Sequence, residues 1–172
     1  ENLLSITRIN NEKIKIEKTS VILDELIDSV MTKFLNRHPE QKVTIDIPNE
    51  IVVVSVDPIL IEQVLMNLLE NAVFHAENMT HIILRVFASE RKVIFEIADD
   101  GCGIREDMLK DIFGGTYGTQ NNSADGKKRN AGIGLSVCAT IIKAHDGEIS
   151  AENRKDGGAL FRFTLGKEDS AY

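Results

Sequence analysis

Residues 57–76 read DPILIEQVLMNLLENAVFHA, and this stretch predicts the clearest helix of the chain. Asp57 is a favoured N-cap residue, and Pro58 suits the first helical position, so we expect the helix to start here. Two amides, Asn67 and Asn71, are four residues apart and therefore stack on one side of it. Apolar residues recur at helical spacing and predict one buried face: Ile61, Val64, Leu65, Leu68, Leu69 and Ala72.

N-terminal to this stretch, the spacing of apolar residues predicts a second helix and three short strands. The expected elements are a helix over 23–34 that ends before Pro39, a strand over 14–16, and strands over 43–47 and 51–56. The last two strands are rich in β-branched residues, and we expect residues 48–50 to join them as a hairpin.

C-terminal to this stretch, the expected elements are strands over 81–88 and 92–98, a helix over 133–145, and strands over 148–152 and 160–165. Residues 104–131 are polar and weakly periodic, so we expect a long functional loop with one helical turn at its start. Together these elements predict an α+β fold. It is a two-layer α/β sandwich, with a mixed, mostly antiparallel sheet and three long helices on one face.

Length and composition indicate one soluble globular domain. The chain has 172 residues, of which 42% are hydrophobic and 27% charged, as suits a single core. Its net charge of -7 argues against nucleic-acid binding, which usually needs a basic face. No apolar run reaches the roughly 20 residues of a membrane helix. Cys102 and Cys138 lack metal-ligand spacing, which favours a reduced, cytoplasmic setting.

The amide pair is the first pattern that carries chemistry. A carboxamide oxygen is a hard ligand suited to Mg²⁺, which keeps several waters and shares phosphate oxygens. Burying two amides beside Leu68 and Leu69 is costly unless each amide finds a partner. Asn67 and Asn71 also fit ordinary surface asparagines of an amphipathic helix, and both interpretations stay open on this pattern alone.

Residues 99–104, DDGCGI, are the second pattern, and they follow a predicted strand. The Asp99 carboxylate can accept a hydrogen bond from an exocyclic amine. Gly101 and Gly103 let the backbone approach a flat base. The alternative is a simple turn, since Asp and Gly are common turn residues.

The third pattern is Gly132-Ile133-Gly134-Leu135 at the expected start of a helix. Free N–H groups at a helix start can bind an anion, and glycines permit its close approach. The basic run 127–129 just before it is either a solvated surface or a lid that brings charge to phosphates. The pair Gly157-Gly158 predicts a hairpin turn into the last strand.

In this order, the patterns resemble the ATP-binding domain of sensor histidine kinases. That domain has the Bergerat, or GHKL, fold of gyrase, Hsp90 and MutL. The matching stretches are IEQVLMNLLENAVFHA for the N box, DDGCGI for the G1 box, GIGLSV for the G2 box and GGALF for the G3 region. Together with the opening ENLLSITRI, the sequence is most similar to the potassium-responsive KdpD-type sensor kinases.

The resemblance implies that ATP and Mg²⁺ bind in a pocket of this domain. Asn71 would ligate Mg²⁺ with Asn67 beside it, and Asp99 would bind the adenine amine. The remaining nucleotide-binding residues implied by the resemblance are His75, Gly101, Gly103, Ile104, Gly132, Gly134, Leu135 and Phe161. No catalytic side chain is expected in this chain, because the phosphoacceptor histidine belongs to a separate dimerisation domain.

The resemblance also implies a domain organisation and partners. Residues 1–12 would be the end of a dimerisation-hairpin helix, 13–168 the ATP-binding kinase domain and 169–172 a tail. The sequence opens without a natural start, so we expect a fragment of a homodimeric sensor protein. Its membrane-anchoring segments would lie outside it. The expected partners are its own dimerisation domain and a response regulator.

Two positions depart from the family's usual residues. Phe74 replaces a lysine that reaches toward phosphate, and Asn130 stands where glycine is common. In the gyrase and MutL branch, a glutamate at the position of Asn67 activates water, so we expect phosphoryl transfer rather than hydrolysis here. Glu70 points about 100° away from Asn71 around the helix. An ATPase clamp and a degenerate ATP-binding module remain as alternatives.

Overall fold

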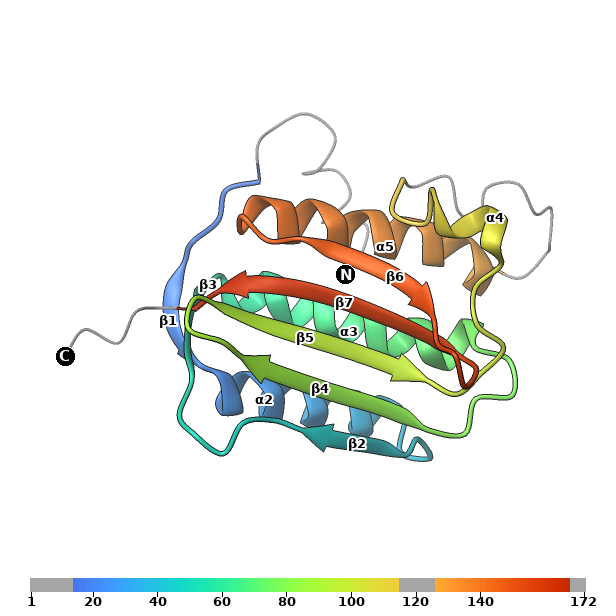
Figure 1. Cartoon of the computed structure of the whole chain (residues 1–172), viewed down its shortest axis with the longest axis horizontal. Coiled ribbons are helices and arrows are strands. Elements are labelled where there is room, and N and C mark those ends of the chain that lie inside the picture. The colour runs from blue at the N-terminus through green and yellow to red at the C-terminus, as the bar shows by residue number, and fades with distance from the viewer. Residues whose placement is uncertain (1–13, 115–125, 168–172) are drawn as a thin grey trace.

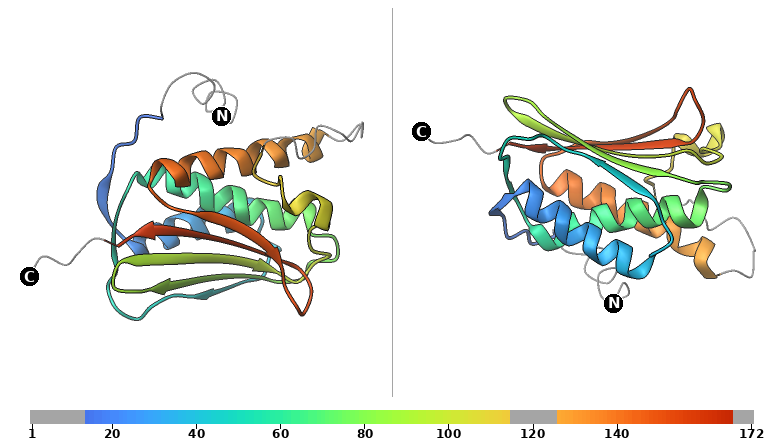
Figure 2. Two further views of the ribbon diagram at one scale, coloured as in Figure 1. Left: turned by 45° about the horizontal axis from the view of Figure 1, so that its top comes forward. Right: turned by 90° about the horizontal axis from the view of Figure 1, so that it is seen from below.

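A five-stranded sheet with the order β2-β4-β5-β7-β6 forms one layer, and three long helices cover one of its faces (Figures 1 and 2). The computed structural model describes residues 14–114 and 126–167. Its sheet strands are β2 (Val43–Asp46), β4 (Ile82–Ala88), β5 (Lys92–Asp99), β6 (Ile149–Asn153) and β7 (Ala159–Gly166). The long helices are α2 (Leu23–Arg37), α3 (Pro58–His75) and α5 (Gly126–Ala144), and α4 (Glu106–Leu109) is short. The expected α+β sandwich is thereby confirmed.

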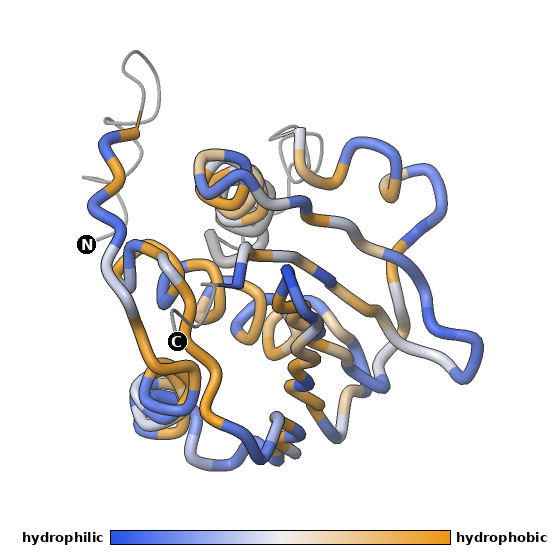
Figure 3. The backbone as a smooth tube through the Cα atoms, turned by 60° about the vertical axis from the view of Figure 1, so that its left-hand side comes forward, coloured by the Kyte–Doolittle hydropathy of each residue, from blue (hydrophilic) through white to orange (hydrophobic). Residues whose placement is uncertain are grey.

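Of the helices, α3 forms the centre of the helical layer and begins as the sequence predicts. Asp57 is its N-cap, and the Asp57 side chain accepts the Leu60 N–H at 3.3 Å. The predicted apolar face is buried, and the same holds for the apolar face of α2. In Figure 3 the tube changes between orange and blue along the helices, as expected for elements with one buried face.

Strand pairing around α2 differs from the prediction. The strand expected over 14–16 lies instead at β1 (Thr19–Ile22), and the expected hairpin does not form. β2 pairs in parallel with β4, whereas β3 (Val53–Val56) pairs with β1 in a separate two-stranded sheet. Parallel neighbours need a long crossover, and β3 and α3 supply it between β2 and β4.

His145 follows α5 and is buried, with 4% of its surface exposed. Its Nε2 accepts the Asp57 N–H at 3.0 Å, and its Nδ1 donates to the Ile141 carbonyl at 2.8 Å. Burial lowers its pKa. The imidazole is therefore neutral, and it ties the end of α5 to the start of α3.

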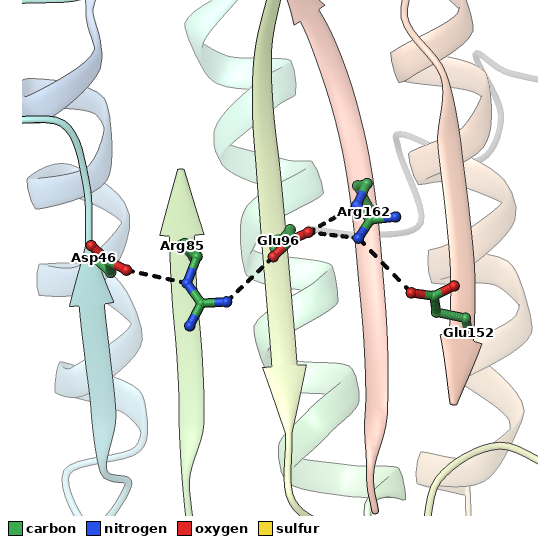
Figure 4. Close-up of polar contacts among 5 residues, drawn as sticks. All are labelled: Asp46, Arg85, Glu96, Glu152 and Arg162. Atoms are coloured by element: carbon green, nitrogen blue, oxygen red, sulfur yellow. Dashed lines mark hydrogen bonds and ion pairs between the residues drawn. The ribbon is translucent and has the colours of Figure 1, made fainter. Parts of the chain in front are cut away.

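On the uncovered face of the sheet, one charged residue from each strand takes part in a row of ion pairs (Figure 4). The side chains in order across the sheet are Asp46, Arg85, Glu96, Arg162 and Glu152. Their closest N···O distances are 3.1, 3.6, 2.7 and 3.8 Å in the same order. Glu96 lies at the centre and is only 9% exposed, because arginines from both neighbouring strands cover it. We call this row the charge ladder.

Candidate functional site

A small pocket lies where the C-terminal end of α3, the end of β5 and α5 meet. Its lining residues are Asn71, His75, Ala76, Asp99, Gly103, Ile104, Ile112, Leu135 and Ala159. Its volume is about 20 Å³, which is room for one or two water molecules.

Asp99 ends β5 and forms a polar wall of this pocket. It is 4% exposed, and its Oδ1 accepts N–H bonds from Gly101 at 2.9 Å and Ala159 at 3.3 Å. No described residue donates to Oδ2. Burial raises the pKa of Asp99, although the two N–H bonds favour its carboxylate.

Gly101 and Gly103 sit in the loop of residues 99–104, and both are closely packed. A Cβ on Gly101 would lie 2.7 Å from the Ala76 Cβ at the end of α3. Gly103 has φ +76°, and its Cβ would lie 2.7 Å from Oδ1 of Asn153. The 99–104 loop is therefore held between α3 and β6, and of these two glycines only Gly103 lines the pocket.

The β6–β7 hairpin holds the 99–104 loop by contacts that the sequence analysis missed. Asn153 accepts the Ile104 N–H at 2.7 Å and donates to the Ile104 carbonyl at 2.6 Å. Arg154 donates to the Asp99 carbonyl oxygen at 2.7 Å. A Cβ on Gly158, which has φ +86°, would lie 2.0 Å from that same oxygen. The Gly-Gly pair predicted the hairpin turn, but no local pattern links it to a loop about fifty residues earlier.

The structure separates the two asparagines of α3. Asn71 lines the pocket, and its side chain forms no hydrogen bond with another described residue. The side chain of Asn67 instead donates to the Gly134 carbonyl of α5 at 3.4 Å. Asn67 therefore joins two helices and lies outside the pocket lining.

At the end of α3, His75 lines the pocket and Phe74 does not. The Phe74 ring is 44% exposed and packs edge-on against His38, with ring centroids 5.6 Å apart. Glu70 accepts hydrogen bonds from Arg37 at 3.2 Å and contacts His38 at 3.5 Å. The Glu70 carboxylate thus faces α2, as the helical geometry predicts.

The helix that carries Gly132 and Gly134 starts earlier than expected. α5 begins at Gly126, so both glycines lie beyond its first turn, where N–H groups bond within the helix. The predicted anion site at a helix start is therefore not formed in this arrangement. Leu135 is buried and lines the pocket. Residues 115–125 of the expected lid lie outside the described residues.

Six of the eleven predicted binding residues meet at the pocket: Asn71, His75, Asp99, Gly103, Ile104 and Leu135. Of the others, Phe161 is 2% exposed and packs T-shaped on Phe113, with ring centroids 6.4 Å apart. It belongs to the core and anchors the segment that follows α4. Ala76, Ile112 and Ala159 complete the pocket lining and were not predicted.

The pocket lies within a stretch of the chain that matches a known protein family. Residues 56–169 match the family described as histidine kinase-, DNA gyrase B-, and HSP90-like ATPase (HATPase_c). The chain belongs to this family. The matched residues include every residue that lines the pocket.

The relatives of this HATPase_c chain are sensor kinases. Sensor protein KdpD of Clostridium acetobutylicum is 36% identical over 168 residues, 98% of this chain and 19% of its own length. The sensory kinase SasA of Nostoc sp. is 41% identical over 145 residues, 84% of this chain and 34% of its own length. The chain thus spans about a fifth to a third of these curated relatives, and the expected likeness to KdpD is confirmed.

Solved structures agree with this assignment. The nucleotide-free catalytic domain of histidine kinase ThkA superposes with a TM-score of 0.72 at 32% identity, over 88% of this chain and 96% of that one. The chain is therefore an ATP-binding catalytic domain of the sensor-histidine-kinase type. Within the described residues, none of its helices has the length and apolar character needed to cross a membrane.

Proposed function

We propose that this chain binds ATP with Mg²⁺ and donates the γ-phosphate to a histidine on a dimerisation domain. From there the phosphoryl group would pass to an aspartate of a response regulator. The observation that best supports ATP binding is the position of Asp99. Its Oδ1 is held by two backbone N–H groups, while no described residue donates to its Oδ2, and Asp99 lines the pocket. An acceptor placed in this way suits the exocyclic amine of adenine, which is a hydrogen-bond donor.

The residues at the pocket also fit a magnesium ion that is shared with phosphates. Mg²⁺ usually takes only one or two protein oxygens and completes its shell with water and phosphate. Asn71 offers a carboxamide at the pocket with no other partner among the described residues. No group of three or more acidic, His or Cys side chains in the described part forms a full metal cage. Bound Mg²⁺ would neutralise charge on the phosphates.

Transfer to a histidine is favoured over hydrolysis because neither Asn67 nor Glu70 offers a base for water at the pocket. Asn67 stands where the gyrase branch has its glutamate, and it is bonded to the Gly134 carbonyl. Glu70 faces α2 and contacts Arg37 and His38. Phosphoryl transfer depends mainly on positioning and charge neutralisation, so it needs no such base.

The decisive test is the binding of a non-hydrolysable ATP analogue to the chain and its Asp99→Asn variant. We expect the variant to bind about tenfold to a hundredfold more weakly, because a charged acceptor is replaced by a donor. Burial raises the pKa of Asp99, so the neutral isostere should fold normally. Asp156→Asn, in the exposed β6–β7 turn, is the matched control. Equal affinity in Asp99→Asn would remove Asp99 from the binding site.

A second experiment separates the three activities. A longer protein that carries the phosphoacceptor helix is incubated with γ-labelled ATP, and both phosphoprotein and free phosphate are measured. Labelled protein that passes its label to a response regulator supports the proposal. Steady phosphate release without phosphoprotein favours an ATPase clamp, and binding without either product favours a degenerate module. ThkA has been solved in complex with the response regulator TrrA, which motivates the regulator as partner.

A further inference from the structure

The 99–104 loop is attached to the domain at two ends of unequal strength. Its start belongs to β5, where Asp99 receives bonds from Gly101, Ala159 and Arg154. Its middle is held by Asp100, whose carboxylate accepts hydrogen bonds from the Thr80 N–H, the Thr80 hydroxyl and the His81 N–H. The Cys102 N–H also donates to the Glu77 carbonyl at 3.1 Å. Beyond Cys102, no backbone–backbone bond among the described residues holds Gly103 or Ile104, so the position of the loop's far end depends on side chains.

Asn153 supplies the attachment at that far end. Its amide pairs with both backbone groups of Ile104, at 2.7 and 2.6 Å, as a neighbouring strand would. Among the described residues, no other group bonds the N–H or carbonyl of Ile104. Gly103 fits beneath this contact only without a side chain, because its Cβ would lie 2.7 Å from Asn153 Oδ1.

The contact matters because the loop separates two parts of the pocket. Asp99 Oδ2 lies at one end of the loop, and Gly103 and Ile104 line the pocket at the other. Adenine presents an amine where guanine presents a carbonyl oxygen. A carboxylate distinguishes adenine from guanine only if the opposite wall of the pocket holds the amine or carbonyl of the base at hydrogen-bonding distance from it. A base that is displaced from this position is bound with less selectivity.

We propose that Asn153 is a positioning residue that fixes the Gly103–Ile104 wall of the pocket and thereby contributes to the selection of adenine over guanine. Asn153 does not line the pocket, so it acts through Ile104. This inference rests on the proposed ATP binding and assigns part of its base specificity to one side chain of the β6–β7 hairpin.

The test compares ATP and GTP analogues on the 172-residue chain with Mg²⁺, by calorimetry. In Asn153→Ala we expect the dissociation constant for the ATP analogue to rise about tenfold, because two hydrogen bonds are lost. We also expect the ratio of the GTP to the ATP dissociation constant to fall. Asn153 is exposed, so its truncation leaves no core cavity, and the variant should fold. Glu152→Gln, one residue earlier on β6, should leave both values unchanged.

Two further measurements distinguish the role of Asn153 from a failure of the proposed ATP binding. Asn153→Asp keeps the acceptor for the Ile104 N–H but sets an oxygen against the Ile104 carbonyl, so it should weaken binding as the alanine variant does. In the unaltered chain, the Ile104 amide should exchange with solvent as slowly as a strand amide. Failure of the unaltered chain to bind the ATP analogue contradicts the proposed function. Normal affinity and normal ATP-to-GTP selectivity in both variants, or fast exchange at Ile104, contradicts the role of Asn153 alone.

Discussion

Both ring nitrogens of His145 are engaged at a buried junction of two helices. Nδ1 carries the proton that is donated to Ile141, and Nε2 must remain unprotonated to accept the Asp57 N–H. A histidine after a helix C-terminus predicts a stabilising cation from sequence, as the helix dipole favours. At His145, burial instead lowers the pKa of the ring.

Acidification should therefore destabilise the fold through His145. The unfolded chain takes up the proton near the ordinary histidine pKa of about 6.5, while the folded chain does so only at lower pH. The free energy of unfolding should consequently decrease as pH falls from 7.5 to 5.5, measured by urea unfolding. The decrease should shrink in His145→Gln and persist in His81→Gln, a residue outside the core. Equal pH dependence in all three proteins would assign the effect elsewhere.

At the scale of elements, the β6–β7 hairpin shows how a turn supports a distant loop. Gly157 and Gly158 both have positive φ, at +95° and +86°. A Cβ on Gly157 would meet nothing within 4 Å, whereas one on Gly158 would overlap the Asp99 carbonyl. A side chain at Gly157 would therefore cause backbone strain alone, whereas a side chain at Gly158 would cause both backbone strain and a steric clash.

Alanine at each glycine should give different losses of stability. Gly157→Ala should cost about 1–3 kcal/mol, the usual strain of a side chain at positive φ. Gly158→Ala adds overpacking of about 1–3 kcal/mol and should also weaken binding of the ATP analogue by displacing Asp99. Chemical unfolding and calorimetry measure the two effects. Equal stability and affinity in the two variants would show that the turn does not support the 99–104 loop.

Local patterns were sufficient for elements whose partners are near in sequence. The hairpin of β4 and β5 and the apolar faces of α2 and α3 all lie where periodicity places them. The prediction that β2 and β3 form a hairpin was wrong. A run of β-branched residues predicts a strand but does not indicate which strand it pairs with. The start of α5 was missed because Gly126 and its polar neighbours give no helical signal.

For the whole molecule, ligand binding should raise thermal stability. A ligand that binds only the folded chain at a hundred times its dissociation constant adds about 2.7 kcal/mol. For a chain of this size that corresponds to about 5–10 °C in Tm. We expect this shift with the ATP analogue and Mg²⁺, followed by scanning fluorimetry. A chelator, or Asn71→Ala, should remove most of it. Asn36→Ala on the exposed side of α2 should keep the full shift, and a shift that is insensitive to the chelator would contradict the magnesium site.

The candidate site was predictable where motif residues also line the pocket. Asn71, Asp99 and Gly103 come from separate elements, and the fold brings them together. Asn67 was predicted beside Asn71 at the pocket but lies outside its lining. Residues four apart share a helix side only approximately, and the side chain of Asn67 donates to the Gly134 carbonyl of α5 instead. The support from Asn153 and Arg154 was invisible, since such contacts exist only after the strands have paired.

The charge ladder has a consequence for how the sheet reaches its correct register. Side chains alternate between the two faces of a strand, so a slip of one residue exchanges the faces. In β4, β5 and β7 the residues on either side of the charged residue of the ladder belong to the core, such as Leu84 and Val86 beside Arg85. A slipped strand would thus push its charge into the helical layer and expose apolar residues to water, at a cost of several kcal/mol. The row of ion pairs therefore forms in only one register of the strands, and it favours that register over the slipped ones.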